Sequence, residues 1–142
     1  MPRRLTHTCV YVLDQESAKD FYTRRLGFEV RSDVMMGGEF EGAGRGFRWL
    51  TVGPADQPDV ELILADVAMG HDARTSDQLR DLIAKGTFSA GSLATDDCRG
   101  DFERLRADGV EFLQEPMERP YGIEAVFRDD SGNWFSLNQM YG

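Results

Sequence analysis

A strand–helix–strand pattern near the start of the chain is the feature that most limits how the chain can fold. Residues 6–13 are rich in β-branched and aromatic side chains and alternate as a strand does. Asp14 can cap the helix that follows, because its carboxylate accepts from a free backbone N–H. An apolar stripe at helical spacing comes next, formed by Ala18, Phe21, Tyr22 and Leu26. Gly27 predicts the end of this helix, since glycine enters the left-handed region without a clash, and residues 28–30 return as a strand.

The same order of elements occurs again in the second half of the chain. Residues 89–95 form a weaker strand, and Asp96 or Asp97 can cap a helix that ends at Gly109. The apolar stripe of this helix consists of Cys98, Phe102 and Leu105. Aligning Gly27 with Gly109 brings the two caps into register as well. An internal repeat of this length sets the architecture of a chain, so we predict two copies of one unit.

The remaining segments complete both units. Strands are predicted at residues 47–52, 59–64, 124–128 and 134–140, and a short helix is predicted at residues 76–85. We therefore predict an α+β fold of two βαβββ units, whose curved mixed sheets surround a cavity with the helices outside. A single domain, residues 1–142, would contain the first unit (5–65), a connector with the short helix (66–87) and the second unit (88–142).

Charge and composition restrict the partners. A net charge of −9 repels phosphate backbones, so we predict no nucleic-acid partner. No apolar run approaches the ~20 residues that a membrane helix needs, and no signal peptide is recognisable, so we predict a cytoplasmic protein without a membrane partner. Cys9 and Cys98 form neither a disulfide framework nor a Cys-x-x-Cys metal site, and we predict two reduced thiols.

A glycine-rich segment follows the first unit's second strand. Five glycines lie between residues 37 and 46, directly after Met35 and Met36. Glycine this dense disfavours regular structure. Two interpretations stay open: a plain hairpin loop between two strands, or a mobile lid that covers a ligand and contacts it through the methionines.

At this point the sequence resembles the vicinal oxygen chelate superfamily, which contains glyoxalase I, bleomycin-resistance proteins and extradiol dioxygenases. The resemblance rests on a histidine in the first strand, an aspartate, a helix with Phe21-Tyr22 and Leu26-Gly27-Phe28, and the closing segment 127–135. That family builds its cavity from paired βαβββ units, usually as a homodimer. The resemblance therefore implies this fold, a small-molecule ligand and a homodimer.

The resemblance also implies a metal site, and this chain carries half of it. His7 lies where the family has its first-strand histidine ligand, and Glu61 lies where it has the first carboxylate. Imidazole and carboxylate suit Zn, Ni, Fe or Mn. In the second unit the corresponding positions fall at Ser89 or Ala90 and at Ser136, which are not usual ligands. We therefore expect a divalent metal to be weakly held or absent.

Further candidate residues follow from the faces of the strands. Cys9 and Tyr11 share the face of His7 by alternation, and we expect them to contact the ligand. On the last strand and in the turn before its neighbour, the candidate ligand-binding residues are Trp134, Ser136, Asn138 and Tyr121. Core packing is the alternative for Trp134. His71 is interpreted as a solvated loop residue.

Two classes of function are favoured, and a third option, an accessory domain without a ligand, also stays open. In the first, the protein is a lyase, isomerase or dioxygenase acting on a small oxygenated or aromatic molecule, with Glu61 as general base and His7 as orienting group or metal ligand. In the second, it is a metal-free protein that sequesters a drug without catalysis. The retained His7 and Glu61 favour the first, and the missing second-unit ligands favour the second.

Overall fold

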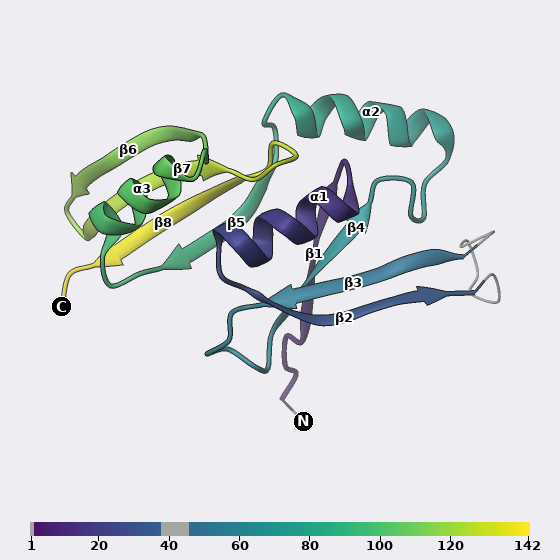
Figure 1. The fold of residues 1–142 in the computed structure, drawn as a ribbon, viewed down its shortest axis with the longest axis horizontal. Coiled ribbons are helices and arrows are strands. Elements are labelled where there is room, and N and C mark those ends of the chain that lie inside the picture. The colour runs from purple at the N-terminus through teal and green to yellow at the C-terminus, as the bar shows by residue number, and fades with distance from the viewer. Residues whose placement is uncertain (1, 38–45) are drawn as a thin grey trace.

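The computed structural model describes residues 2–37 and 46–142, and Figure 1 shows their arrangement. The first half contains β1 His7–Val12, α1 Gln15–Asp20, a π-helical turn η1 Phe21–Arg25, β2 Glu29–Met36, β3 Phe47–Gly53 and β4 Glu61–Asp66. Helix α2 Ala73–Ala84 leads to β5 Ser89–Ala94, α3 Cys98–Ala107, β6 Phe112–Arg119, β7 Gly122–Arg128 and β8 Trp134–Met140. Most of the predicted loop or lid, residues 38–45, lies outside the described residues. Within the described ranges, no helix is long and apolar enough to cross a membrane.

The strands form two sheets of identical order, which confirms the predicted fold class. The first sheet has the order β1-β4-β3-β2, and the second has the order β5-β8-β7-β6. Strand β1 pairs in parallel with β4, and β5 pairs in parallel with β8, whereas all the other strand pairs are antiparallel. Figure 1 shows the second sheet, in green and yellow, to the left of the first. The repeat in the sequence is thus a repeat of sheet topology.

The predicted helix ends are confirmed at both glycines. Gly27 has φ 73° and Gly109 has φ 90°, the left-handed region that lets a chain leave a helix. The first helix is not uniformly α-helical, however. It changes at Phe21 into η1, and the side-chain oxygen of Thr23 donates to the carbonyl of Lys19 at 2.8 Å. This hydrogen bond from a side chain to the carbonyl four residues earlier competes with the regular backbone hydrogen bonds of the helix.

Several elements begin earlier or run further than predicted. Strand β2 continues to Met36, beyond the predicted end at residue 30. The polar Asp33 interrupts the apolar alternation that marks a strand in a sequence. In the folded protein Asp33 is accommodated because Lys19, on the helix-covered side, forms an ion pair with it. Strand β6 extends to Arg119, beyond the short strand at residues 110–112 that the second repeat predicts. Helix α2 begins at Ala73 rather than Ser76, since the Asp72 carboxylate caps it.

The hydrophobic core lies between the helix-covered faces of the two sheets. The first sheet contributes Val10, Val12, Leu50, Val52 and Leu64, and the second contributes Ala125, Phe127, Phe135 and Leu137. The first helix adds Ala18, Phe21 and Tyr22. Because successive strand side chains point to opposite faces, each sheet turns its other face away from this shared core.

We call these two outward surfaces the first and second open faces. According to the strand pairing, the residues of the first open face are His7, Cys9, Tyr11, Trp49, Thr51, Glu61 and Ile63. The residues of the second open face are Gln114, Arg119, Glu124, Trp134, Ser136 and Asn138. These two surfaces contain most of the candidate residues, and they belong to different halves of the chain.

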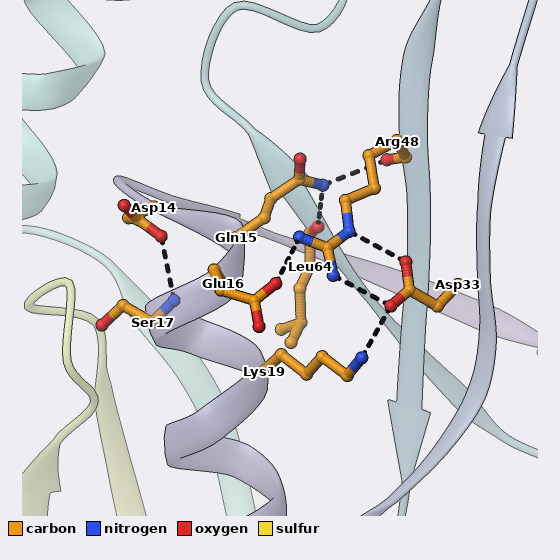
Figure 2. Close-up of polar contacts among 8 residues, drawn as sticks. All are labelled: Asp14, Gln15, Glu16, Ser17, Lys19, Asp33, Arg48 and Leu64. Atoms are coloured by element: carbon orange, nitrogen blue, oxygen red, sulfur yellow. Dashed lines mark hydrogen bonds and ion pairs between the residues drawn. The ribbon is translucent and has the colours of Figure 1, made fainter.

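An ion-pair cluster fastens α1 to the helix-covered side of the first sheet (Figure 2). Arg48 on β3 donates two hydrogen bonds to Asp33 on β2, at 2.8 and 2.9 Å, and Lys19 donates a third at 2.8 Å. Arg48 also pairs with Glu16 at 2.9 Å, and Gln15 donates to two strand carbonyls. The donors from Arg48 and then Lys19 hold the pKa of Asp33 well below its usual range. The cluster therefore stabilises the position of α1 on the sheet.

The turn between β7 and β8, residues 129–133, fastens the second half of the chain to the first. The Ser131 hydroxyl accepts from the backbone N–H of Leu13 at 2.9 Å, and the Asn133 amide donates to the carbonyl of Tyr11 at 2.9 Å. This turn corresponds to the closing segment on which the family resemblance rests. It serves here as the hydrogen-bonded seam between the two halves.

Candidate functional site

His7 and Glu61 are immediate neighbours on the first open face. Strands β1 and β4 pair in parallel with His7 opposite Glu61, and His7 Nε2 lies 3.5 Å from Glu61 Oε1. Thr51 on β3 is buried and donates to the same carboxylate oxygen at 2.6 Å. The hydroxyl therefore fixes the carboxylate next to the imidazole. Both side chains remain partly exposed, so a ligand on this face can reach them.

Aromatic rings share the first open face with this pair. The Trp49 ring centre is 5.9 Å from that of His7, and the Tyr11 ring centre is 5.1 Å from that of His71. His71 lies in the loop before α2, as predicted, but its ring is only partly exposed to solvent, and its Nδ1 lies 2.8 Å from the carbonyl oxygen of Val67. Aromatic surfaces with a few fixed polar groups are typical of sites for small organic ligands.

Cys9 lies on the same face, between His7 and Tyr11 on β1. It is exposed, yet the neighbouring groups remove enough solvent from the thiol to raise its pKa. A raised pKa lowers the thiolate fraction at neutral pH, and the thiolate is the nucleophilic form. The raised pKa therefore favours a contact role for Cys9 over a role as catalytic nucleophile.

Trp134, Ser136 and Asn138 lie together on the second open face. Ser136 is buried and donates to Glu124 Oε2 at 3.0 Å, while the Asn138 amide donates to the Ser136 hydroxyl at 2.8 Å. Tyr121, in the turn between β6 and β7, is exposed. Among the described residues of one chain, no hydrogen bond or ion pair joins these side chains to His7 or Glu61.

Several polar or aromatic residues of the two faces were not identified from the sequence, among them Trp49, Thr51 and Glu124. Trp49 and Thr51 come from β3, and their approach to β1 and β4 depends on a strand register that one sequence does not reveal. Glu124 could have been found, because it interrupts the apolar residues of β7. A carboxylate at such a position needs a polar partner, as Glu61 does.

The donor set does not fit a tightly held metal. His7 and Glu61 provide one imidazole and one carboxylate, and the latter also accepts the Thr51 hydrogen bond. Elsewhere in the described part of the chain, no group of three His, Cys, Asp or Glu side chains comes close enough to hold an ion. Structural and catalytic zinc sites use three or four protein ligands.

A groove of about 720 Å³ lies away from both open faces. It is formed by the end of η1, the turn between β3 and β4, strand β5 and helix α3, with Phe28, Pro54, Leu93 and Leu105 among its lining. Neither His7, Glu61 nor Ser136 lines it. The candidate residues of the open faces therefore lie outside this groove.

Comparison with known proteins gives a consistent set of relatives. The model of the Glyoxalase/Bleomycin resistance protein/Dioxygenase superfamily matches residues 4–137. The crystal structure of UcmS2 is 54% identical, covers 97% of this chain and 98% of its own, and superposes with a TM-score of 0.88. TnmS3, an antibiotic binding protein from Streptomyces sp. CB03234, is 32% identical over 99% of this chain and 98% of its own, with a TM-score of 0.72. YurT of Bacillus subtilis (strain 168) is 36% identical over 96% of this chain and 98% of its own length.

Proposed function

The chain belongs to the glyoxalase/bleomycin resistance protein/dioxygenase superfamily, and on this basis we propose that it binds and sequesters a small, partly aromatic, oxygenated molecule. The first open face carries the proposal: the Trp49 ring lies 5.9 Å from His7, which adjoins the fixed Glu61 carboxylate. Similarity to the antibiotic binding protein TnmS3 supports a ligand of the antibiotic class. The donor set, with two candidate metal ligands, supports binding without catalysis.

We further propose that the ligand site is completed in a cytoplasmic homodimer. Each open face is half of a cavity wall, with His7, Glu61 and Trp49 on one and Trp134 and Ser136 on the other. Since the two faces of one chain turn away from a shared core, the first face of one copy would meet the second face of its partner. An isologous dimer contains two such composite cavities.

Tryptophan fluorescence tests this proposal directly, because the chain has two tryptophans, Trp49 and Trp134. The variant Trp134→Phe leaves Trp49 as the reporter, and Trp49→Phe leaves Trp134. We expect a panel of oxygenated aromatic antibiotics to include compounds that quench both single-tryptophan variants at micromolar concentration. Quenching of neither variant by any compound would contradict ligand binding at the open faces.

One observation favours an enzymatic alternative. Glu61 lies 3.5 Å from His7, an arrangement that can position a carboxylate general base beside an orienting imidazole. The substitution Glu61→Gln keeps the shape and removes the charge. An enzyme would lose turnover of its substrate, whereas a sequestering protein would keep its affinity for a neutral ligand within about twofold and lose affinity for a cationic one. Product analysis by mass spectrometry, beside a binding titration, separates the two.

A further inference from the structure

The two halves of the chain are joined at the closing turn and left apart at the corresponding place in the other half. The closing turn satisfies the free edge of β1: Ser131 accepts from the N–H of Leu13, and Asn133 donates to the carbonyl of Tyr11. Sheet order makes β5 the counterpart of β1, and the turn between β3 and β4, residues 54–60, the counterpart of the closing turn. Among the described residues, no hydrogen bond or ion pair joins this turn to β5. The groove of about 720 Å³ lies between them instead.

Arg31 holds the turn of residues 54–60 on its own side of the groove. Its guanidinium donates to the carbonyl of Pro54 through Nη2 at 2.7 Å and to the carbonyl of Pro58 through Nη1 at 3.0 Å. Pro54 and Gln57 of the same turn line the groove. Because Arg31 lies on β2, these hydrogen bonds fix one wall of the groove to the first sheet.

The edge of β5 that faces away from β8 has unpaired backbone groups. The N–H of Thr95 donates to the carbonyl of Asn138 at 2.9 Å, so the backbone of Thr95 faces β8. Backbone groups of successive strand residues point to alternate sides, and those of Ser92 and Ala94 therefore face the other way. No other strand of the described residues pairs with β5, and both residues line the groove. A free strand edge of this kind is a template for the addition of another strand.

Apolar side chains line the groove beside this edge. Phe28 follows the end of the first helix, Leu93 lies on β5 and Leu105 lies on α3. All three are partly exposed and pack against the hydrophobic core. An added peptide strand forms main-chain hydrogen bonds along the edge, and alternate side chains fill the adjoining pocket. The groove therefore provides both parts of a site for an extended peptide.

Unpartnered charges in the groove suit the two ends of a free peptide. Arg25 is half-buried and has no hydrogen bond or ion pair among the described residues, whereas the neighbouring Arg24 is held by Asp20 at 2.8 Å. A guanidinium binds a carboxylate through two parallel N–H bonds. Asp56 and Asp108 also line the groove, and in the described ranges their exposed side chains have no partner. A free peptide has a carboxylate for Arg25 and an ammonium group for these aspartates.

We propose that the groove is a second ligand site, which binds a short free peptide in an extended conformation. The peptide adds a strand to β5 through the backbone groups of Ser92 and Ala94. One apolar side chain contacts Phe28 and Leu105, and the C-terminal carboxylate pairs with Arg25. The proposal is independent of the function proposed for the open faces.

Three tetrapeptides of one sequence, Thr-Val-Thr-Leu, test the proposal by calorimetric titration at pH 7. The parent peptide has two free termini, the second peptide has an amidated C-terminus, and the third has an acetylated N-terminus. We expect the parent to bind at concentrations below about 1 mM and the amidated peptide to bind about tenfold more weakly, the usual effect of a lost hydrogen bond to a charged group. The acetylated peptide should bind about threefold more weakly, because the aspartates are exposed.

Two variants assign the preference for a free carboxylate to one guanidinium. Arg25→Gln should reduce the tenfold preference for the parent over the amidated peptide to about twofold. Arg24→Gln is the matched control, because it removes the same charge one residue earlier from a side chain that Asp20 already holds. This control should keep the full preference. If Arg25→Gln fails to fold, the comparison of the two peptides on the wild-type protein still tests the carboxylate.

Hydrogen exchange measured by nuclear magnetic resonance locates the bound peptide. With about nine-tenths of the protein in complex with the parent peptide, we expect the amide protons of Ser92 and Ala94 to exchange about tenfold more slowly, since the closed form protects them. Cys9 is the matched control. On β1, Thr6 accepts from the N–H of Glu61 and faces β4, so the backbone of Cys9 faces the free edge of that strand by the same alternation. Its exchange rate should stay unchanged.

Each part of the proposal has a result that overturns it. Absence of binding of the parent peptide at about 1 mM would exclude the groove as a peptide site. Binding with unchanged exchange at Ser92 and Ala94, or with equal slowing at Cys9, would exclude strand addition to β5. Equal affinity for the amidated peptide would exclude the role of Arg25, and equal affinity for the acetylated peptide would exclude a free peptide as the occupant. None of these results changes the expectation for the antibiotic panel at the open faces.

Discussion

The hydroxyl of Tyr22 donates a 2.7 Å hydrogen bond to Oδ2 of Asp129, joining the first helix to the closing turn of the second sheet. Both residues are buried. Asp129 Oδ1 accepts from three successive backbone N–H groups of its own turn, each at 2.9 Å. Burial, followed by the nearby Asp129 charge, raises the pKa of Tyr22 well above its usual value. The phenol therefore remains protonated and continues to donate across the seam.

Removing that hydroxyl should weaken the joint between the two halves. Tyr22→Phe leaves the buried Asp129 carboxylate one donor short, and we expect the free energy of unfolding to fall by about 1–3 kcal/mol. Urea denaturation monitored by circular dichroism measures the change. The control is Tyr141→Phe, because Tyr141 is exposed and should tolerate the substitution. Equal stability of the two variants would contradict a stabilising role for the bond.

The ion pairs that hold α1 should make stability depend on pH. The folded pKa of Asp33 is lowered by Arg48 and Lys19, so its contribution is complete above the unfolded value of about 4 and is lost as pH falls through the folded value. Asp33→Asn should cost about 1–2 kcal/mol at pH 7, and progressively less below pH 4, since the cluster is partly solvated. Denaturation at several pH values measures this.

The control for that experiment is an exposed ion pair on the same helix. Asp20 pairs with Arg24 one turn later, and both side chains are largely exposed. Asp20→Asn should change stability by less than about 0.5 kcal/mol at any pH. A loss as large as that of Asp33→Asn would show that net charge, rather than the cluster, determines the effect.

The two cysteines should differ sharply in reactivity. Cys9 is exposed and Cys98 is buried. We expect iodoacetamide to label one thiol per chain in the native protein and both thiols after unfolding in guanidinium chloride. Because the pKa of Cys9 is raised above 9.0, its labelling rate should still increase above pH 9. Mass spectrometry of tryptic peptides identifies the labelled residue, and native labelling of Cys98 would contradict the fold.

The proposed dimer predicts a particle of twice the 16.0 kDa chain mass. Val34 lies on the first open face opposite Trp49 and is 49% exposed in a single chain. Val34→Glu would introduce a charge into the proposed interface and should shift the equilibrium towards monomer. Gln78→Glu, an exposed position on α2, is the matched control. Light scattering at micromolar concentration measures the mass, and a monomeric wild-type protein would exclude the dimer.

The fold was largely predictable because its signals are local and occur twice. Asp14 and Gly27 mark one helix, and Gly109 marks the end of its counterpart, so the repeat could be recognised without knowing any tertiary contact. Strand β2 was underestimated for the opposite reason. Asp33 is a poor strand residue until Arg48 and Lys19 approach it, and that approach is a product of the completed fold.

The candidate site was predictable only along single strands. Alternation gives the face of His7 on β1 and of Glu61 on β4, since it needs no partner strand. Whether two such residues become neighbours depends on the register between their strands. That register brings Thr51 next to Glu61 and Glu124 next to Ser136. The family resemblance pointed to Ser136 for the missing carboxylate, one strand away from the Glu124 side chain.

The seam has a consequence for how this sequence can change over evolutionary time. The two halves share a topology, but neither half can change independently of the other at the contact between Tyr22 and Asp129. A change at either position leaves an unmatched group inside the protein, and the stability cost is offset only by a second change. Across relatives of this chain, we expect Tyr22 and Asp129 to be inherited together or replaced together.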